Sequence, residues 1–149
     1  MIPILIQLGT AFLGSLGFAL LFGLRRHYLL PAALGGMLSW GIYLLVRSLL
    51  VSPFLACLAA SAFSVVYAEL LARWMRSPAT LFMIPAVIPL VPGSSLYYAM
   101  SCVVQRDLEN AREYGAQTLE FALAIAAGMS FVLAFRELRT RRQNHQQGG

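Results

Sequence analysis

The chain has no lysine and little charge of either sign. Only 11% of its 149 residues are charged, and its 11 strongly basic side chains are all arginines. The absence of lysine excludes the GxxxxGK[ST] loop of ATP-hydrolysing P-loop proteins. The scarcity of charge excludes an ordinary soluble domain, whose surface is about 25–35% charged. The arginines lie in the gaps between apolar runs, so the basic pI reflects membrane topology, and no nucleic-acid partner is expected.

Residues that carry out catalysis or bind metals are also scarce. Asp107 is the only aspartate, and the two histidines, His27 and His145, lie in a short loop and in the C-terminal tail. Neither a Ser-His-Asp triad nor a metalloprotease motif can be written from these residues. Cys57 and Cys102 lie inside apolar runs without CxxC or CxxH spacing, which is typical of buried structural cysteines. We therefore expect no catalytic residues, no metal, no cofactor and no enzyme activity.

Hydrophobic residues dominate the rest of the chain. They make up 59% of it and raise its mean hydropathy to +0.72. Several apolar runs are close to the ~20 residues that a helix needs to cross a bilayer. The sequence therefore predicts an all-α integral membrane bundle of about five transmembrane helices. The predicted spans are residues 2–24, 28–46, 48–72, 79–104 and 117–135, followed by a basic tail at 136–149.

The arginines divide unevenly between the two sides of this predicted bundle. One side carries Arg25, Arg26, Arg73, Arg76, Arg136, Arg139, Arg141 and Arg142, and the other carries Arg47, Arg106 and Arg112. Because cytoplasmic loops are enriched in arginine, the bias predicts an N-terminus outside and a C-terminus in the cytoplasm. The segment 105–116 mixes charged residues with an apolar face, which predicts a short interfacial helix between the last two spans.

The fourth predicted span contains an unusual cluster of helix breakers. Ser77 and Pro78 are expected to cap its start, and no charge occurs from Ser77 to Gln105. Within this run, prolines stand at positions 85, 89 and 92, and a glycine and two serines follow at 93–95. Each interior proline costs a helix about 3 kcal/mol, and unpaired backbone groups in hydrocarbon cost several more. The pattern predicts a broken helix, with a second half-helix that begins near Ser94.

A broken helix at membrane depth is a device that transporters use to build a binding site. The amides at the start of the second half-helix could hold a carboxylate without a basic side chain, and carbonyls freed by the prolines could bind an ammonium group. The predicted substrate-binding residues are Pro89, Pro92, Gly93, Ser94, Ser95, Tyr97 and Tyr98. The alternative is a proline kink that only packs against neighbouring helices.

Two glutamates inside the predicted spans, Glu69 and Glu120, are candidates for proton coupling. Ionisable groups in a membrane are costly and often functional. Arg73 follows Glu69 at i+4, so a structural ion pair within the helix is an equal alternative. For Glu120, which lies near the start of the fifth span, a position at the membrane interface is favoured over coupling.

Several segments of the chain carry the pattern of a known family. They are Leu16–Phe22, Ala33–Gly36, Glu69–Arg73, Ser77–Thr80, Ile84–Gly93 and Glu113–Leu119. On these residues, which extend over nearly the whole chain, the sequence resembles the threonine/serine exporter family. It is similar to the family's short integral-membrane subunit, the type also found as the smaller component of a two-subunit succinate exporter. The segment Ile84–Gly93 is the most specific part of the resemblance.

The resemblance implies an exporter of small amino acids or C4-dicarboxylates in a bacterial inner membrane, driven by the proton gradient. It also implies a partner, a longer family subunit with a soluble N-terminal part and a hydrophobic half of its own. Because no arginine lies deep in a span, the sequence leans towards a zwitterionic amino acid over a dicarboxylate. Two alternatives stay open: a non-transporting assembly subunit, and a homo-oligomeric channel.

Overall fold

The protein is described by a computed structural model that covers residues 2–50 and 52–147, with side chains for residues 3–50 and 52–138. Within these residues the chain forms helices joined by short turns and no strand, which confirms the predicted all-α fold. The elements are α1 (Ile2–Leu21), α2 (Arg26–Leu49), α3 (Pro53–Met75), α4 (Thr80–Val87), the 3₁₀ turn η1 (Ile88–Leu90), α5 (Gly93–Val104) and α6 (Leu108–Gln147).

Local signals in the sequence explain where the first helices end and begin. Gly23 adopts a positive φ of 66° just after α1, and the amide of Leu24 donates to the carbonyl of Ala19. This is the Schellman arrangement that glycine favours at a helix C-terminus. Helix α3 begins at Pro53, where a proline costs nothing because the first amides of a helix have no intrahelical partner. The third span therefore starts later than the 48–72 range that hydropathy indicates.

The turn between α3 and α4 differs from the prediction made for Ser77. Arg76 ends α3 in the left-handed conformation, and the amide of Ser77 donates back to the carbonyl of Ala72 at 3.0 Å. Ser77 thus belongs to the C-terminal cap of α3, and Ala79 occupies the N-cap position of α4. The expectation that Ser77 caps the fourth span was wrong because α4 begins at Thr80, two residues too late for the Ser77 side chain to stand at the N-cap position.

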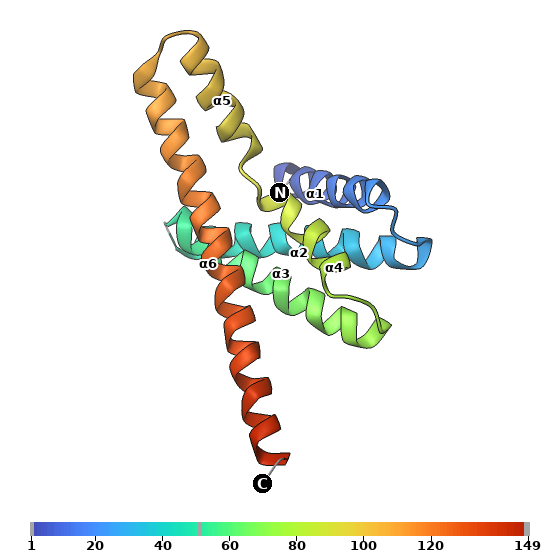
Figure 1. The fold of residues 1–149 in the computed structure, drawn as a ribbon. Coiled ribbons are helices and arrows are strands. Elements are labelled where there is room, and N and C mark those ends of the chain that lie inside the picture. Colours follow the sequence, from blue (N-terminus) through green and yellow to red (C-terminus); the bar gives the residue numbers. More distant parts are fainter. Residues whose placement is uncertain (1, 51, 148–149) are drawn as a thin grey trace.

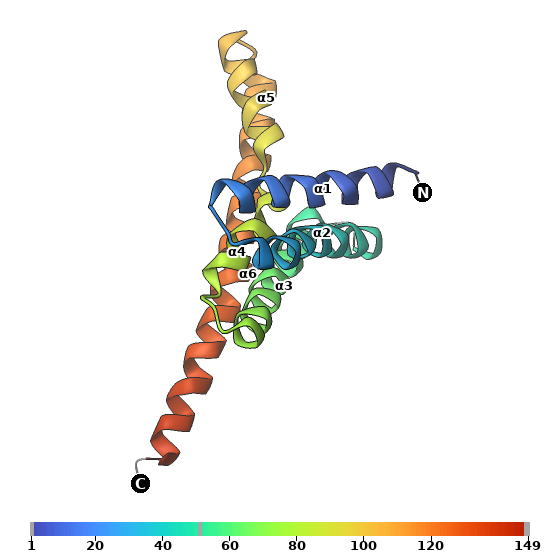
Figure 2. The ribbon, with the colours of Figure 1, turned by 90° about the vertical axis from the view of Figure 1, so that its right-hand side faces the viewer.

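Helices α1, α2 and α3 form a layer, and α6 crosses this layer at a steep angle (Figure 1). Helix α5 runs back along the first half of α6, so the two helices form a hairpin that projects away from the layer (Figures 1 and 2). Helix α4 and η1 lie against α1, α2 and α3 at the crossing. The broken fourth span therefore begins inside the layer and leaves it through α5.

Small residues hold the helices together. Ala56, Ala60 and Ser64 are buried on α3. They follow one another every four residues, a spacing of small residues that lets helices approach closely. On α6, a Cβ at Gly128 would lie 2.5 Å from the carbonyl oxygen of Leu58 and would overlap the hydroxyl of Ser61. Apolar burial drives little association in lipid, so close backbone contact of this kind is what joins membrane helices.

The segment predicted as a separate interfacial helix is instead continuous with the last span. Arg106 takes a positive φ of 59° after α5, and Asp107 caps the next helix by accepting a hydrogen bond from the amide of Asn110. From Leu108 onward a single helix of 40 residues runs to Gln147. By length and composition, four helices could cross a membrane, or five if the bent α4–α5 pair counts as one span.

Candidate functional site

The break in the fourth span lies between Pro89 and Gly93. Helix α4 tolerates Pro85 in its interior, passes into the short turn η1, and then gives way to extended backbone at Val91. Helix α5 restarts at Gly93, and the two halves differ in direction by 50°. The structure confirms the predicted break, and it places that break after Pro89 although the first proline occurs four residues earlier.

The break leaves backbone groups without helical partners. Proline has no amide proton, so Pro89 cannot donate to the carbonyl of Pro85 as an ordinary residue would. At the start of α5, Gly93 donates to Val91 and Leu96 donates to Pro92. Within residues 2–50 and 52–147, no such bond is found for the amides of Ser94 and Ser95, as expected for the first turn of a helix.

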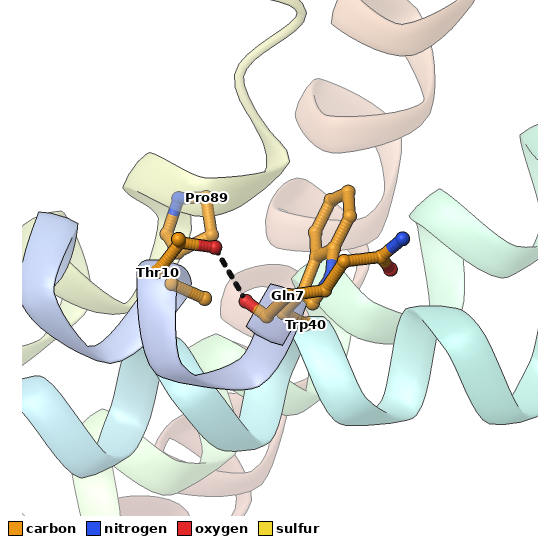
Figure 3. A pocket seen from close by; sticks show the side chains of 5 residues that line it. Gln7, Thr10, Trp40 and Pro89 are labelled. Carbon is orange, nitrogen blue, oxygen red and sulfur yellow. Dashed lines mark hydrogen bonds between the residues drawn. The ribbon is translucent and has the colours of Figure 1, made fainter. Parts of the chain in front are cut away.

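A pocket of about 230 Å³ lies beside the break, where α1, α2 and η1 meet. It is lined by Gln7, Thr10, Ala11, Trp40 and Pro89. The Thr10 hydroxyl donates to the Gln7 carbonyl at 2.9 Å. Figure 3 shows Gln7 and Thr10 one turn apart on α1, with Trp40 and Pro89 beside them from the two neighbouring elements. The pocket is therefore polar on its α1 side and apolar on its η1 side.

The indole of Trp40 carries an unpaired donor at this pocket. Its Nε1 is buried and has no hydrogen-bond partner among the described residues. On its other side the ring stacks on Tyr43, with the centroids 4.9 Å apart, so the indole is held in place. A buried donor without an acceptor costs about 1–3 kcal/mol. An acceptor supplied by a bound molecule would remove that cost.

A second pocket of about 130 Å³ lies near the other end of α1, again against the fourth span. Its lining is apolar except for one hydroxyl, and consists of Phe22, Leu24, Thr80, Leu81, Ile84 and Pro85. With a rise of 1.5 Å per residue, Thr10 and Phe22 are about 18 Å apart along the chain direction of α1. Both pockets therefore lie on the interface between α1 and the α4–η1 segment, well separated along it.

A tightly packed contact between α1, α2 and α4 separates the two pockets. A Cβ on Gly36 would overlap the Ser15 hydroxyl and would lie 3.1 Å from the carbonyl oxygen of Pro85. The Ser15 side chain is completely buried, and its hydroxyl has no partner among the described residues. The unpaired Ser15 hydroxyl and the carbonyl freed by Pro89 thus both lie close to Gly36, midway along the interface.

The other residues predicted to bind substrate do not line either pocket. Helix α5 has no buried residue, and nothing lies within 4 Å of a Cβ built on Gly93. Tyr97 and Tyr98 are 68% and 52% exposed. Tyr98 contacts Tyr114 of α6 with ring centroids 5.5 Å apart. Of the predicted set, which also included Pro92, Ser94 and Ser95, only Pro89 lines one of these two pockets.

Glu69 pairs with a cation from a distant part of the sequence. Its Oε1 lies 3.1 Å from Nη1 of Arg136 on α6, and the side chains are 14% and 51% exposed. The two atoms are close enough for an ion pair, but the carboxylate oxygen receives no hydrogen bond with acceptable geometry. The crossing of α3 and α6 thus gives Glu69 an ion-pair partner other than Arg73, the partner considered from the sequence. Glu120 is half-buried on α6, next to Phe121, whose carbonyl faces Cys57.

Sequence reasoning missed Gln7, Thr10 and Trp40. Trp40 suited packing or an interfacial belt equally well, and only the fold places it at a pocket. A signal was nevertheless present on α1, whose hydrogen-bonding side chains are Gln7, Thr10 and Ser15. A spacing of three residues puts Gln7 and Thr10 on one face of a helix, whereas Ser15 lies about 140° around the helix from Thr10, and polar residues in a span usually face the protein interior.

Comparison with known families agrees with the sequence pattern. A sequence model of the family described as "Threonine/Serine exporter, ThrE" matches residues 7–135, a range that contains both pockets and the broken span. No solved structure matches the chain. The match covers most of the chain, and the apolar helices fit a multi-pass membrane protein. The chain therefore belongs to the threonine/serine exporter family and has a membrane-transport role.

Proposed function

We propose that this protein is the membrane half of a secondary exporter of threonine and serine, and that it works with a longer subunit of the same family. The observation that carries the proposal is the broken span α4–η1–α5, whose first part lines two pockets that lie at different positions along α1. Substrate would pass between α1 and α4–η1, from the second pocket past Ser15 to the pocket beside Trp40. With the N-terminus outside, this direction is export.

The surface of α5 and α6 supports the need for a partner. Membrane helices usually tilt by no more than about 40° from the bilayer normal, and α6 crosses the α1–α3 layer steeply (Figure 2). The layer and the hairpin cannot both stand upright in one bilayer in this arrangement. A second subunit would align the two parts and cover α5, none of whose side chains is buried.

Glu69 is the residue that we propose for proton coupling. Its carboxylate is largely buried at the crossing of α3 and α6 and is balanced by Arg136. Protonation would remove the charge of Glu69 and with it the attraction to Arg136, which would weaken the contact between α3 and α6. A proton could thus change how α6 packs on the layer.

The proposed function is tested by efflux assays in cells that produce this chain, the longer subunit, or both. We expect threonine and serine to leave the cells only when both subunits are present. Efflux from this chain alone would instead support a homo-oligomeric channel. If efflux from the longer subunit alone equals that of the pair, this chain is an assembly subunit. Succinate efflux without threonine efflux would replace the amino acids with a dicarboxylate.

Proton coupling needs a separate comparison. Glu69→Gln should remove the increase in efflux that an inward proton gradient produces, whereas Glu109→Gln, an exposed change in the first turn of α6, should not. Arg136→Gln distinguishes coupling from structure. If both Glu69→Gln and Arg136→Gln lower the amount of folded complex but leave the gradient dependence intact, the ion pair is structural.

A further inference from the structure

We infer that the pocket between α1, α2 and η1 is a binding site for a small zwitterionic amino acid that carries a hydroxyl group, with Trp40, Gln7 and Thr10 as its polar contacts. This inference rests on the proposed transport function and deepens it by naming the residues that recognise the substrate. At about 230 Å³, the pocket is smaller than the 300–1,000 Å³ of sites for drug-sized ligands. It has room for about eight water-sized groups at ~30 Å³ each, which suits a molecule of the size of threonine.

The unpaired Trp40 donor defines what the ligand must bring. An indole N–H donates and cannot accept, so its partner must be an oxygen with free lone pairs. A carboxylate is the strongest such group. The Nε1 atom is covered by protein atoms, and Gln7 crosses in front of the indole in the view of Figure 3. Gln7 is exposed on its helix, so its side chain can move aside and let a ligand reach the indole.

Thr10 and Gln7 supply the opposite kind of contact. The Thr10 hydroxyl already uses its proton to bond the Gln7 carbonyl, so its lone pairs remain available to accept from a ligand ammonium or hydroxyl group. The Gln7 side-chain amide both donates and accepts. The site thus offers a hydrogen-bond donor at Trp40 on α2 and acceptors at Gln7 and Thr10 on α1. This arrangement matches a molecule that carries a carboxylate at one end and hydrogen-bond donors at the other.

The absence of charge decides between the two substrate classes. None of the five lining residues is ionisable, so a bound dicarboxylate would bring two negative charges without any cation to balance them. Removing unpaired charges from water is very costly. A zwitterion is neutral overall and its two charges partly compensate each other. The wall formed by Ala11 and Pro89 is apolar and can receive the methyl group of threonine.

The chain provides its own reporter for this site. Its only tryptophans are Trp40 and Trp74, and Trp74 is 84% exposed at the end of α3. In lipid nanodiscs that hold the Trp74→Phe protein together with a longer subunit whose own tryptophans are replaced by phenylalanine, all indole emission comes from Trp40. We expect threonine and serine to shift this emission saturably below about 10 mM, ten times the upper end of common KM values. Valine, which has the shape of threonine but no hydroxyl, and succinate should produce no saturable shift.

A matched pair of variants tests the contacts. In the Trp74→Phe background, Thr10→Val should raise the apparent Kd for threonine by about three- to tenfold, the factor for one neutral hydrogen bond. Thr118→Val is the control, because Thr118 bonds the Tyr114 carbonyl of its own helix at 2.8 Å, much as Thr10 bonds Gln7, and lies outside the pocket. With Trp74 retained, Trp40→Phe should raise the KM of threonine efflux about tenfold or more, since a bond to a charged group is lost.

The outcomes separate this inference from the proposed function. If the subunit pair exports threonine but the Trp40 emission does not respond to it, the pocket is not the binding site and the transport function stands. If the emission responds to threonine but the pair exports nothing, the site stands and the transport function fails. Saturation by succinate, or equal effects of Thr10→Val and Thr118→Val, would overturn the inference.

Discussion

Replacing Gly36 by alanine is expected to force α1 away from α2 at the tight contact that separates the two pockets. The new Cβ would overlap the Ser15 hydroxyl, would lie 2.6 Å from the Ser15 Cβ, and would lie 3.1 Å from the Pro85 carbonyl oxygen. Gly41 on the same helix provides the matched control. A Cβ at that position meets only the end of the Leu8 side chain, at an ordinary contact distance of 3.5 Å.

The magnitude follows from comparing the two substitutions. Each one replaces glycine in a helix interior and gains about 0.8–1.0 kcal/mol of helix propensity. Only Gly36→Ala adds overpacking, which typically costs 1–3 kcal/mol, so about that much should separate the two variants in free energy of unfolding. Because propensity cancels in the comparison, the difference measures the contacts of the new Cβ with Ser15 and the Pro85 carbonyl oxygen. Gly41→Ala should slightly raise the free energy of unfolding, whereas Gly36→Ala should leave it unchanged or lower it by up to about 2 kcal/mol.

The assay is equilibrium unfolding of the purified protein in mixed micelles by added SDS, followed by far-UV circular dichroism. A second substitution, Ser15→Gly, removes both overlapping atoms and should recover most of the loss in the double variant. Contacting residues commonly show interaction energies of about 0.5–3 kcal/mol in such a cycle. Equal stabilities of Gly36→Ala and Gly41→Ala, or additive effects of Gly36→Ala and Ser15→Gly, would refute the close approach of α1 and α2.

Two further predictions concern the contact between α3 and α6 and the exposure of the two cysteines. Gly128→Ala should be less stable than Gly115→Ala on the same helix by about 1–3 kcal/mol, because its Cβ would lie 2.5 Å from the Leu58 carbonyl oxygen whereas Gly115 has nothing within 4 Å; equal SDS midpoints would contradict the α3–α6 contact. A membrane-impermeant maleimide should label the partly exposed Cys102 and leave the buried Cys57 unmodified, and protection of Cys102 only when the longer subunit is present would place the partner on α5.

Sequence reasoning succeeded where the controlling interactions are local. The break after Pro89 follows from prolines that lack an amide proton, whatever surrounds them. The prediction for Ser77 failed because the residue lies between two helices. Its backbone amide bonds the last turn of α3, and α4 begins only at Thr80. The Glu69 partner was not predictable, since Arg73 and Arg136 are equally suitable cations and only the crossing of α3 and α6 chooses between them.

The sequence by itself determined that this protein is an all-α membrane bundle with a broken fourth span, because hydropathy and proline chemistry depend on few neighbours. It also carried the family pattern that the profile match over residues 7–135 confirms. Only the tertiary structure decided where pockets form. Gln7 and Trp40 are far apart in sequence, and a pocket requires that two helices and a 3₁₀ turn meet with space between them. That depends on how close the small residues Ser15 and Gly36 allow α1 and α2 to approach.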